Sequence, residues 1–216
     1  MYLNLEEINT LIKEQICYET IDKLTDINLL QAYIESNSVK KNIKYLETIL
    51  KKFINNNETI NDIINEYLFK LIPPGTKSII RGLKFNEIVR KHILNIELIN
   101  TPEFEIFFEK KCSDIHSDEI PDFYIKNKIN NKILIGMNQM DFSSGGHQTN
   151  RGMKYISLKF NTDNIKLICV ICNDIKIVSV KSKIYNIYNT GFINKSLCYL
   201  KGLNEIILNH FFNTKC

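Results

Sequence analysis

The chain has 216 residues, of which 44% are hydrophobic, so one domain with a sizeable core, or one domain plus a helical extension, is expected. Its 28 Lys and Arg against 24 Asp and Glu give a net charge of +4, a mild preference for polyanions. No apolar run approaches the roughly 20 residues of a membrane helix, and the acidic residues 1–10 lack a leader pattern. We therefore expect an intracellular, cytoplasmic protein with no signal peptide, transmembrane segment or membrane partner.

Cysteine usage gives no sign of a metal site. Cys169 and Cys172 have the CxxC spacing, but they lie in an apolar run that predicts a buried strand. Side chains three apart on a strand point to opposite faces, and no second CxxC or nearby histidine pair completes a zinc site. Buried, reduced thiols are the better interpretation.

The first 72 residues predict helices throughout. Leu5, Ile8 and Ile12 begin a three-four apolar spacing that continues, with breaks, to Leu71. The run Pro73-Pro74-Gly75 then ends the region. The sequence thus predicts a helical N-terminal subdomain over residues 1–72 and a second domain over residues 73–216. For the helical part we consider a cap or protein-interaction module, and a DNA-recognition or dimerisation module.

The second domain predicts the order helix, strand, strand, strand, helix, strand. We expect these elements at Leu83–Ile93, Phe104–Glu109, Asp122–Ile125, Lys132–Gln139, His147–Leu158 and Ile165–Cys172. A short strand from Leu197 and a helix over Leu203–Phe212 follow, while 174–180 suits a strand or a helix start. The predicted fold class is α+β with an α/β core: a central mixed sheet flanked by helices, after an all-helical region.

Polar groups gather where two of these strands meet. Pro121-Asp122 opens one strand, and Asn138, Gln139 and Asp141 end its hairpin partner. A Gly-rich segment, residues 143–146, leads into the next helix, where free backbone N–H groups and the helix dipole favour an anion such as phosphate.

This order of parts resembles the core of the PD-(D/E)XK nucleases, particularly the type II restriction endonucleases. The resemblance rests on Pro121-Asp122, on the strand spacing and on the run GGHQTNRG at 145–152, and it covers roughly residues 79–171. The family's acidic-x-Lys motif falls where Met137-Asn138-Gln139 stands, so Met137 takes the acidic position and Gln139 the lysine position.

The resemblance implies a restriction-endonuclease-like sheet, Mg²⁺ (or Mn²⁺) as cofactor, double-stranded DNA as substrate and a homodimer. As metal ligands it implies Asp122 and, from the first core helix, Glu87; Asn86 is the alternative to Glu87. The catalytic candidates are Asp122, Gln139, Asn138 and Asp141. The candidate DNA-binding residues are Lys77, Arg81, His147, Gln148, Asn150, Arg151 and Lys154, since Arg suits guanine, Asn or Gln suits adenine, and basic side chains suit phosphates.

Asn138 and Gln139 point to opposite faces of their strand, so only one of them can join Asp122 unless the strand bulges. Two alternatives to a sequence-specific endonuclease remain: a catalytically inactive DNA-binding relative, and a helical protein-interaction module.

Overall fold

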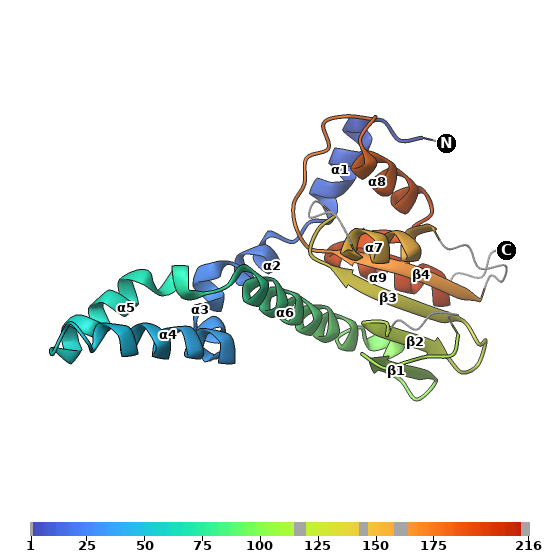
Figure 1. Cartoon of the computed structure of the whole chain (residues 1–216). Coiled ribbons are helices and arrows are strands. Elements are labelled where there is room, and N and C mark those ends of the chain that lie inside the picture. The colour runs from blue at the N-terminus through green and yellow to red at the C-terminus, as the bar shows by residue number, and fades with distance from the viewer. Residues whose placement is uncertain (1, 115–119, 143–146, 158–163, 213–216) are drawn as a thin grey trace. The chain divides into compact units, whose positions relative to one another are not determined.

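The computed structural model describes residues 2–114, 120–142, 147–157 and 164–212, without the side chains of 147–151. It is a mixed α+β structure with an N-terminal helical region and a five-stranded mixed sheet flanked by helices (Figure 1). The fold class predicted from the sequence is therefore confirmed.

Two compact units make up the chain. The helical unit is Asp22–Lys84, and the sheet unit is Met1–Ile21 with Phe85–Cys216. These bounds differ from the division predicted after residue 72, because the first helix, α1 (Leu5–Gln15), belongs to the sheet unit. Its apolar side chains Ile8 and Ile12 lie in the core beneath the sheet.

The helical unit is built from amphipathic helices. It comprises the end of α2 (Tyr18–Lys23), α3 (Asp26–Glu35), α4 (Asn37–Leu50), α5 (Asn57–Leu71) and the first half of α6 (Pro74–Leu94). Asn56 caps α5 by accepting from the N–H groups of Glu58 and Thr59. Helix α6 begins at Pro74 rather than near Leu83, because proline is tolerated in a first helical turn.

The sheet unit carries the strands in the order β1-β2-β3-β4-β5. They are β1 (Phe104–Phe108), β2 (Phe123–Asn127), β3 (Ile133–Gln139), β4 (Ile165–Ile171) and β5 (Leu197–Tyr199). The pairs β1–β2 and β2–β3 are antiparallel, whereas β3–β4 and β4–β5 are parallel. The predicted hairpin over 122–139 is confirmed: in its turn Asn127 Oδ1 accepts from the N–H of Ile129, 2.8 Å away.

Helices cover both faces of this sheet (Figure 1). On one face α1, α7 (His147–Ser157) and α8 (Lys183–Ile193) share a core with alternate residues of β2–β5. On the other, α9 (Leu200–Phe211) contacts β4 and β5. A short 3₁₀ turn, Glu97–Ile99, precedes β1, and residues 174–179 form neither strand nor helix.

Two further expectations concern buried thiols and membranes. Cys169 and Cys172 are buried and not joined in a disulfide. Burial raises the pKa of the Cys172 thiol to about 12, which makes it a poor nucleophile at neutral pH. Across the described ranges, none of the helices combines the length and the apolar character needed to span a bilayer.

Candidate active site

Asp122 lies immediately before β2 and is held by the neighbouring strand. Its backbone N–H donates to the carbonyl of Gly136, and its Oδ2 accepts from the backbone N–H of Asn138 at 2.7 Å. Both partners are in β3. Because backbone groups of β3 hold Asp122, the position of its carboxylate is set by the sheet rather than by a loop.

A helix residue completes this arrangement. The side-chain Nδ2 of Asn86, on α6, donates to Asp122 Oδ1 at 3.3 Å, and Asn86 Oδ1 accepts from Asn138 Nδ2 at 3.0 Å. Asn86, Asp122 and Asn138 therefore form a closed ring of hydrogen bonds joining a helix and two strands.

A second carboxylate reaches the same amide. Glu109 Oε1 accepts from Asn86 Nδ2 at 3.2 Å, so one nitrogen lies between the Glu109 and Asp122 carboxylates. Glu109 directly follows β1 and has a φ of 51°, in the left-handed region that a non-glycine residue rarely adopts. Strained backbone of this kind is concentrated at functional sites. We call Asn86, Glu109, Asp122 and Asn138 the Asp122 cluster.

Gly136 makes room for the ring of Phe123, the residue that follows Asp122. A Cβ on Gly136 would lie 1.8 Å from the Phe123 ring, so any side chain there would displace that ring. Phe123 pairs with Gly136 across the two strands, directly beside Asp122. The glycine therefore lets a buried aromatic residue close the sheet next to the cluster.

Two predicted catalytic residues lie elsewhere. Gln139 is buried on the face of β3 opposite Asn138, and its Nε2 donates to the backbone carbonyl of Asp141 at 2.9 Å. The Asp141 carboxylate accepts from Asn173, just beyond β4. Met137 is fully buried in the core shared with α1 and α8. The structure thus brings Asn138, rather than Gln139 or Asp141, to Asp122, because strand alternation allows only one of the two neighbours on that face.

Of the two candidates on the first core helix, Asn86 and not Glu87 contacts Asp122. Glu87 is exposed and forms an ion pair with Lys91, one turn further along α6, at 3.0 Å. Neighbouring residues on a helix are rotated by about 100°, so the side chain that faces Asp122 is that of Asn86. The Glu109 carboxylate was missed from sequence because it lies in no motif; the end of a strand before a polar loop was the only signal.

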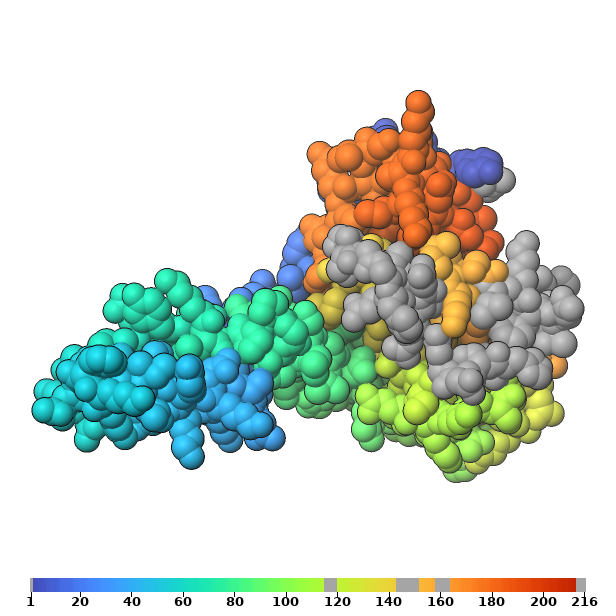
Figure 2. Space-filling view, in the orientation of Figure 1, coloured from blue at the N-terminus to red at the C-terminus, as the bar shows by residue number. Residues whose placement is uncertain are grey.

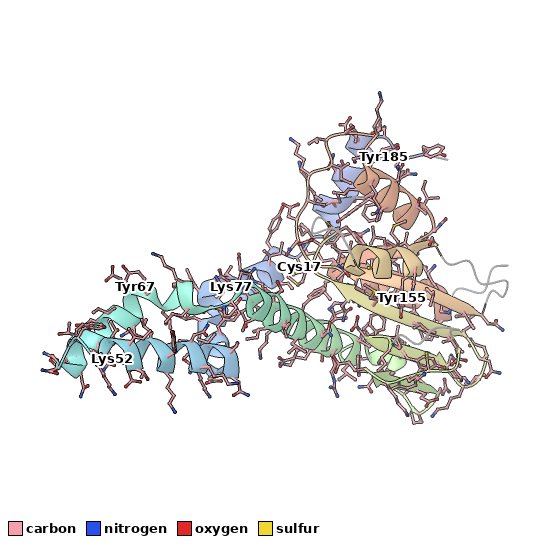
Figure 3. The ribbon with its side chains drawn as sticks, viewed as in Figure 1. Cys17, Lys52, Tyr67, Lys77, Tyr155 and Tyr185 are labelled. Carbon is pink, nitrogen blue, oxygen red and sulfur yellow. The ribbon has the colours of Figure 1, made fainter. Side chains whose placement is uncertain are left out.

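The predicted DNA-binding residues fall into two groups. Lys77 and Arg81 form ion pairs with Asp26 inside the helical unit (Lys77 is labelled in Figure 3), so their charges already have a structural partner. Lys154, on α7, is exposed. The backbone of α7 starts at His147 as expected, but the side chains of His147, Gln148, Asn150 and Arg151 lie outside the described residues, as do residues 143–146.

The cluster also bears on metal binding. Asn138 Oδ1 is buried and has no hydrogen-bond donor among the described residues. A buried, unpaired oxygen acceptor beside a carboxylate suits a hard divalent cation, which binds carboxylate and amide oxygens. No group of three or more His, Cys, Asp or Glu side chains in the described segments could hold a metal. Mg²⁺, however, is bound in many sites by one or two carboxylates, with waters and substrate phosphates completing its shell.

Comparison with known proteins gives little. No family model matches the chain, and no curated protein sequence matches it significantly. One solved structure that is similar is protein VC1899 from Vibrio cholerae, at 10% identity and a TM-score of 0.36. That match covers 92% of this chain and 54% of the other, so the chain spans about half the length of VC1899.

Proposed function

We propose that this protein is a divalent-metal-dependent DNA endonuclease of the restriction-endonuclease type, acting on double-stranded DNA inside the cell. The observation that carries the proposal is the Asp122 cluster. In it a carboxylate at the head of β2 is fixed by the N–H of Asn138 and the side chain of Asn86, with the Glu109 carboxylate at the same amide. Oxygen ligands held in a fixed geometry support phosphodiester hydrolysis on a metal ion.

Asp122 and Asn138 would hold Mg²⁺ or Mn²⁺. Glu109, which accepts from the same Asn86 nitrogen as Asp122, would be a further carboxylate nearby. When bound, the cation would neutralise charge on the phosphate and lower the pKa of a water. The chain's own contribution is preorganisation. Asn86 and the β3 backbone fix Asp122 before substrate arrives, so less reorganisation is required during the reaction.

Substrate binding falls to α7 in this proposal. Its N-terminus begins at His147, after the Gly-rich segment, and α7 contacts both β3 and β4. The helix dipole favours a phosphate at that end. We assign DNA contacts to His147, Gln148, Asn150, Arg151 and Lys154, whose side-chain types suit phosphates and base edges. A homodimer, with one Asp122 cluster for each strand, would cut both strands of a duplex at a specific sequence.

A second candidate has a specific observation in its favour. The side chains that meet Asp122 from α6 and β3 are amides, Asn86 and Asn138, where a metal-dependent nuclease would gain from acids. If Asn138 is placed at the acidic position of the acidic-x-Lys spacing, the lysine position is taken by Met140, which carries no charge. These features suit a relative of the same fold that binds DNA without cutting it.

One experiment separates the two. Purified protein is incubated with plasmid and phage DNA in Mg²⁺, Mn²⁺ or EDTA, beside Asp122→Ala and a matched surface variant, Asp62→Asn on exposed α5. An endonuclease centred on Asp122 gives metal-dependent fragments with wild type and Asp62→Asn, and none with Asp122→Ala. Equal cutting by all three would place the activity elsewhere. DNA binding without cutting in any metal would establish the non-catalytic alternative.

A further inference from the structure

Helix α4 of the helical unit presents an exposed basic face. Its outward side chains include Lys40, Lys41 and Lys44, and Lys51 and Lys52 follow directly at its end, all exposed. The single acid of this helix, Glu47, forms an ion pair with Lys51. Figure 3 labels Lys52 just beyond the end of α4, and in Figure 2 the blue-to-cyan residues of this part of the chain lie at the surface. We call these five lysines the α4 basic face.

A general lysine bias does not explain this arrangement, because the neighbouring helix is its opposite. Helix α5 contacts α4 and has nearly the same length, yet its exposed residues Glu58, Asp62 and Glu66 form an acidic row at four-residue spacing. Lys70 is the one lysine in α5, and it lies over the Tyr67 ring. The charges are thus sorted by helix, positive on α4 and negative on α5.

The geometry of the α4 basic face points to a partner with regularly spaced negative charge. Lys40 and Lys44 lie on one side of the helix, and Lys51, whose charge is partly offset by Glu47, continues that side to a length of roughly 16 Å at 1.5 Å per residue. Duplex DNA presents several phosphates on each strand over this length. The exposed ring of Tyr45 directly follows Lys44 on the same helix. Aromatic residues among lysines suit sugar and base contacts.

The apolar side of α4 is already used. Val39 is buried and Ile43 and Leu46 are partly buried, facing the helices of their own unit, where α4 contacts α3 and α5. A membrane-surface helix needs its apolar face free for the lipid. The part of α4 left exposed is therefore its charged side, which suits a phosphate backbone better than a bilayer.

We propose that the α4 basic face is a docking surface for the phosphate backbone of double-stranded DNA. It deepens the proposed function, since the DNA is the substrate assigned above, and it gives the helical unit the role of holding that substrate. Backbone contacts of this kind supply affinity and register rather than sequence reading.

The test uses the full chain with three neutralised residues, Lys40→Gln, Lys41→Gln and Lys44→Gln, which keep helix propensity. The matched control neutralises three exposed lysines on other helices, Lys13→Gln, Lys70→Gln and Lys201→Gln. Binding of a labelled 30-base-pair duplex is followed by fluorescence anisotropy in EDTA over a series of salt concentrations. Circular dichroism melts check that each variant folds like wild type.

We expect the α4 variant to bind at least about tenfold more weakly and its log–log salt slope to fall in magnitude by about 2–3, since each lost phosphate contact removes about 0.9. The control should keep the wild-type slope within about 1. Equal losses in both variants, or none in the α4 variant, would overturn the proposal. The proposal would also be overturned if the α4 variant lost binding to phosphatidylserine vesicles but bound DNA normally. It would be overturned as well if the variant lost a dimer that the wild type forms while each protomer kept its affinity for DNA.

The result also separates this inference from the proposed nuclease. DNA binding that depends on the α4 basic face, in a protein that never cuts, would support the surface and defeat the nuclease. Cutting that depends on Asp122 while the α4 variant binds normally would defeat the surface alone. If both hold, the α4 variant should cut more slowly below saturation and reach the wild-type single-turnover rate at saturating protein.

Discussion

The backbone N–H of Asn138 donates to Oδ2 of Asp122, 2.7 Å away, so a carboxylate before one strand is bonded by the backbone of the next. Oδ1 of the same carboxylate accepts from Asn86 on α6. A group held from two elements keeps its orientation before any ligand binds. The first prediction tests this positioning.

Asn86→Ala should lower metal-dependent cleavage about 10–100-fold, the usual effect of removing a residue that orients a metal ligand. Glu87→Gln, one position along α6 and paired to Lys91, should leave cleavage unchanged. Single-turnover rates are measured across a Mn²⁺ titration. A positioning role requires the Mn²⁺ concentration for half-maximal rate to rise in Asn86→Ala and to recover in part in Asn86→Gln, which keeps an amide N–H donor for Asp122. Equal loss in Glu87→Gln and Asn86→Ala would contradict the assignment.

Gly136→Ala should destabilise the sheet unit by about 2–4 kcal/mol, because the new methyl group would overlap the buried Phe123 ring. Urea unfolding followed by circular dichroism measures the change. Gly82→Ala is the control: nothing lies within 4 Å of a Cβ there, and α6 is helical at that point. Alanine should stabilise that position by up to about 1 kcal/mol. Similar behaviour of the two variants would show that Phe123 yields freely.

His210 should make the sheet unit sensitive to mild acid. Burial lowers the pKa of this imidazole to about 4, and its Nε2 lies 2.9 Å from the carbonyl of Ile133. In the unfolded chain the pKa is about 6.5, so the unfolded state binds the proton first as pH falls. Stability contributed by neutral His210 is present above about pH 6.5 and is lost as pH falls toward 4.

We expect this loss to be about 2 kcal/mol, allowing for the part of the ring that remains in contact with water. Urea unfolding of wild type and His210→Gln at pH 7.5, 6 and 5 provides the measurement. The free-energy difference between the two proteins should shrink toward pH 5. A difference that stays constant with pH would show that His210 does not titrate in this way.

Asp26 should stabilise the helical unit through Lys77, Arg81 and the hydroxyl of Tyr33. Burial acts to raise the pKa of Asp26, but the Lys77 hydrogen bond and the Arg81 charge outweigh it and leave the pKa lowered. Its contribution is therefore present above the unfolded pKa of about 3.9 and is lost as pH falls through the lower folded value.

Asp26→Asn should cost about 1 kcal/mol at pH 7, a modest value because the ion pairs are partly exposed. Thermal melts at pH 7 and pH 3 compare it with Asp62→Asn, which removes an exposed charge in the same unit. The effect of Asp26→Asn should diminish at pH 3, and Asp62→Asn should have little effect at either pH. An undiminished effect at pH 3 would mean that the charge of Asp26 is not what stabilises the unit.

Patterns of apolar residues predict most of the sheet. The near-continuous apolar run before Cys172 is β4, buried as a central strand should be, and the Asn-rich turn at 127–131 joins β2 to β3. The start of α6 was missed because Pro73-Pro74-Gly75 indicates an ending, although proline at a first turn also begins helices. Local signals of this kind have two interpretations, and packing decides between them.

Part of the site was also predicted, from the pairing of two strands rather than from apolar patterns. Asp122 and the partnership of the two strands follow from the hairpin, and alternation shows that Asn138 and Gln139 cannot both face Asp122. Which of the two does so depends on the register between β2 and β3, which pairs Phe123 with Gly136. Glu109 joins through a left-handed backbone conformation at the end of β1, which no spacing rule indicates.

Helix α1 has a consequence for how the protein is made. It contacts α8, α9 and β5, Leu3 accepts from the Tyr185 hydroxyl, and Gln15 accepts from the N–H of Tyr199. The two hydrogen-bond partners follow Leu3 and Gln15 by 182 and 184 residues, so they are synthesised much later. The contacts within Asp22–Lys84 are all available early. The helical unit can therefore fold before α1, which is synthesised earlier, packs against the sheet.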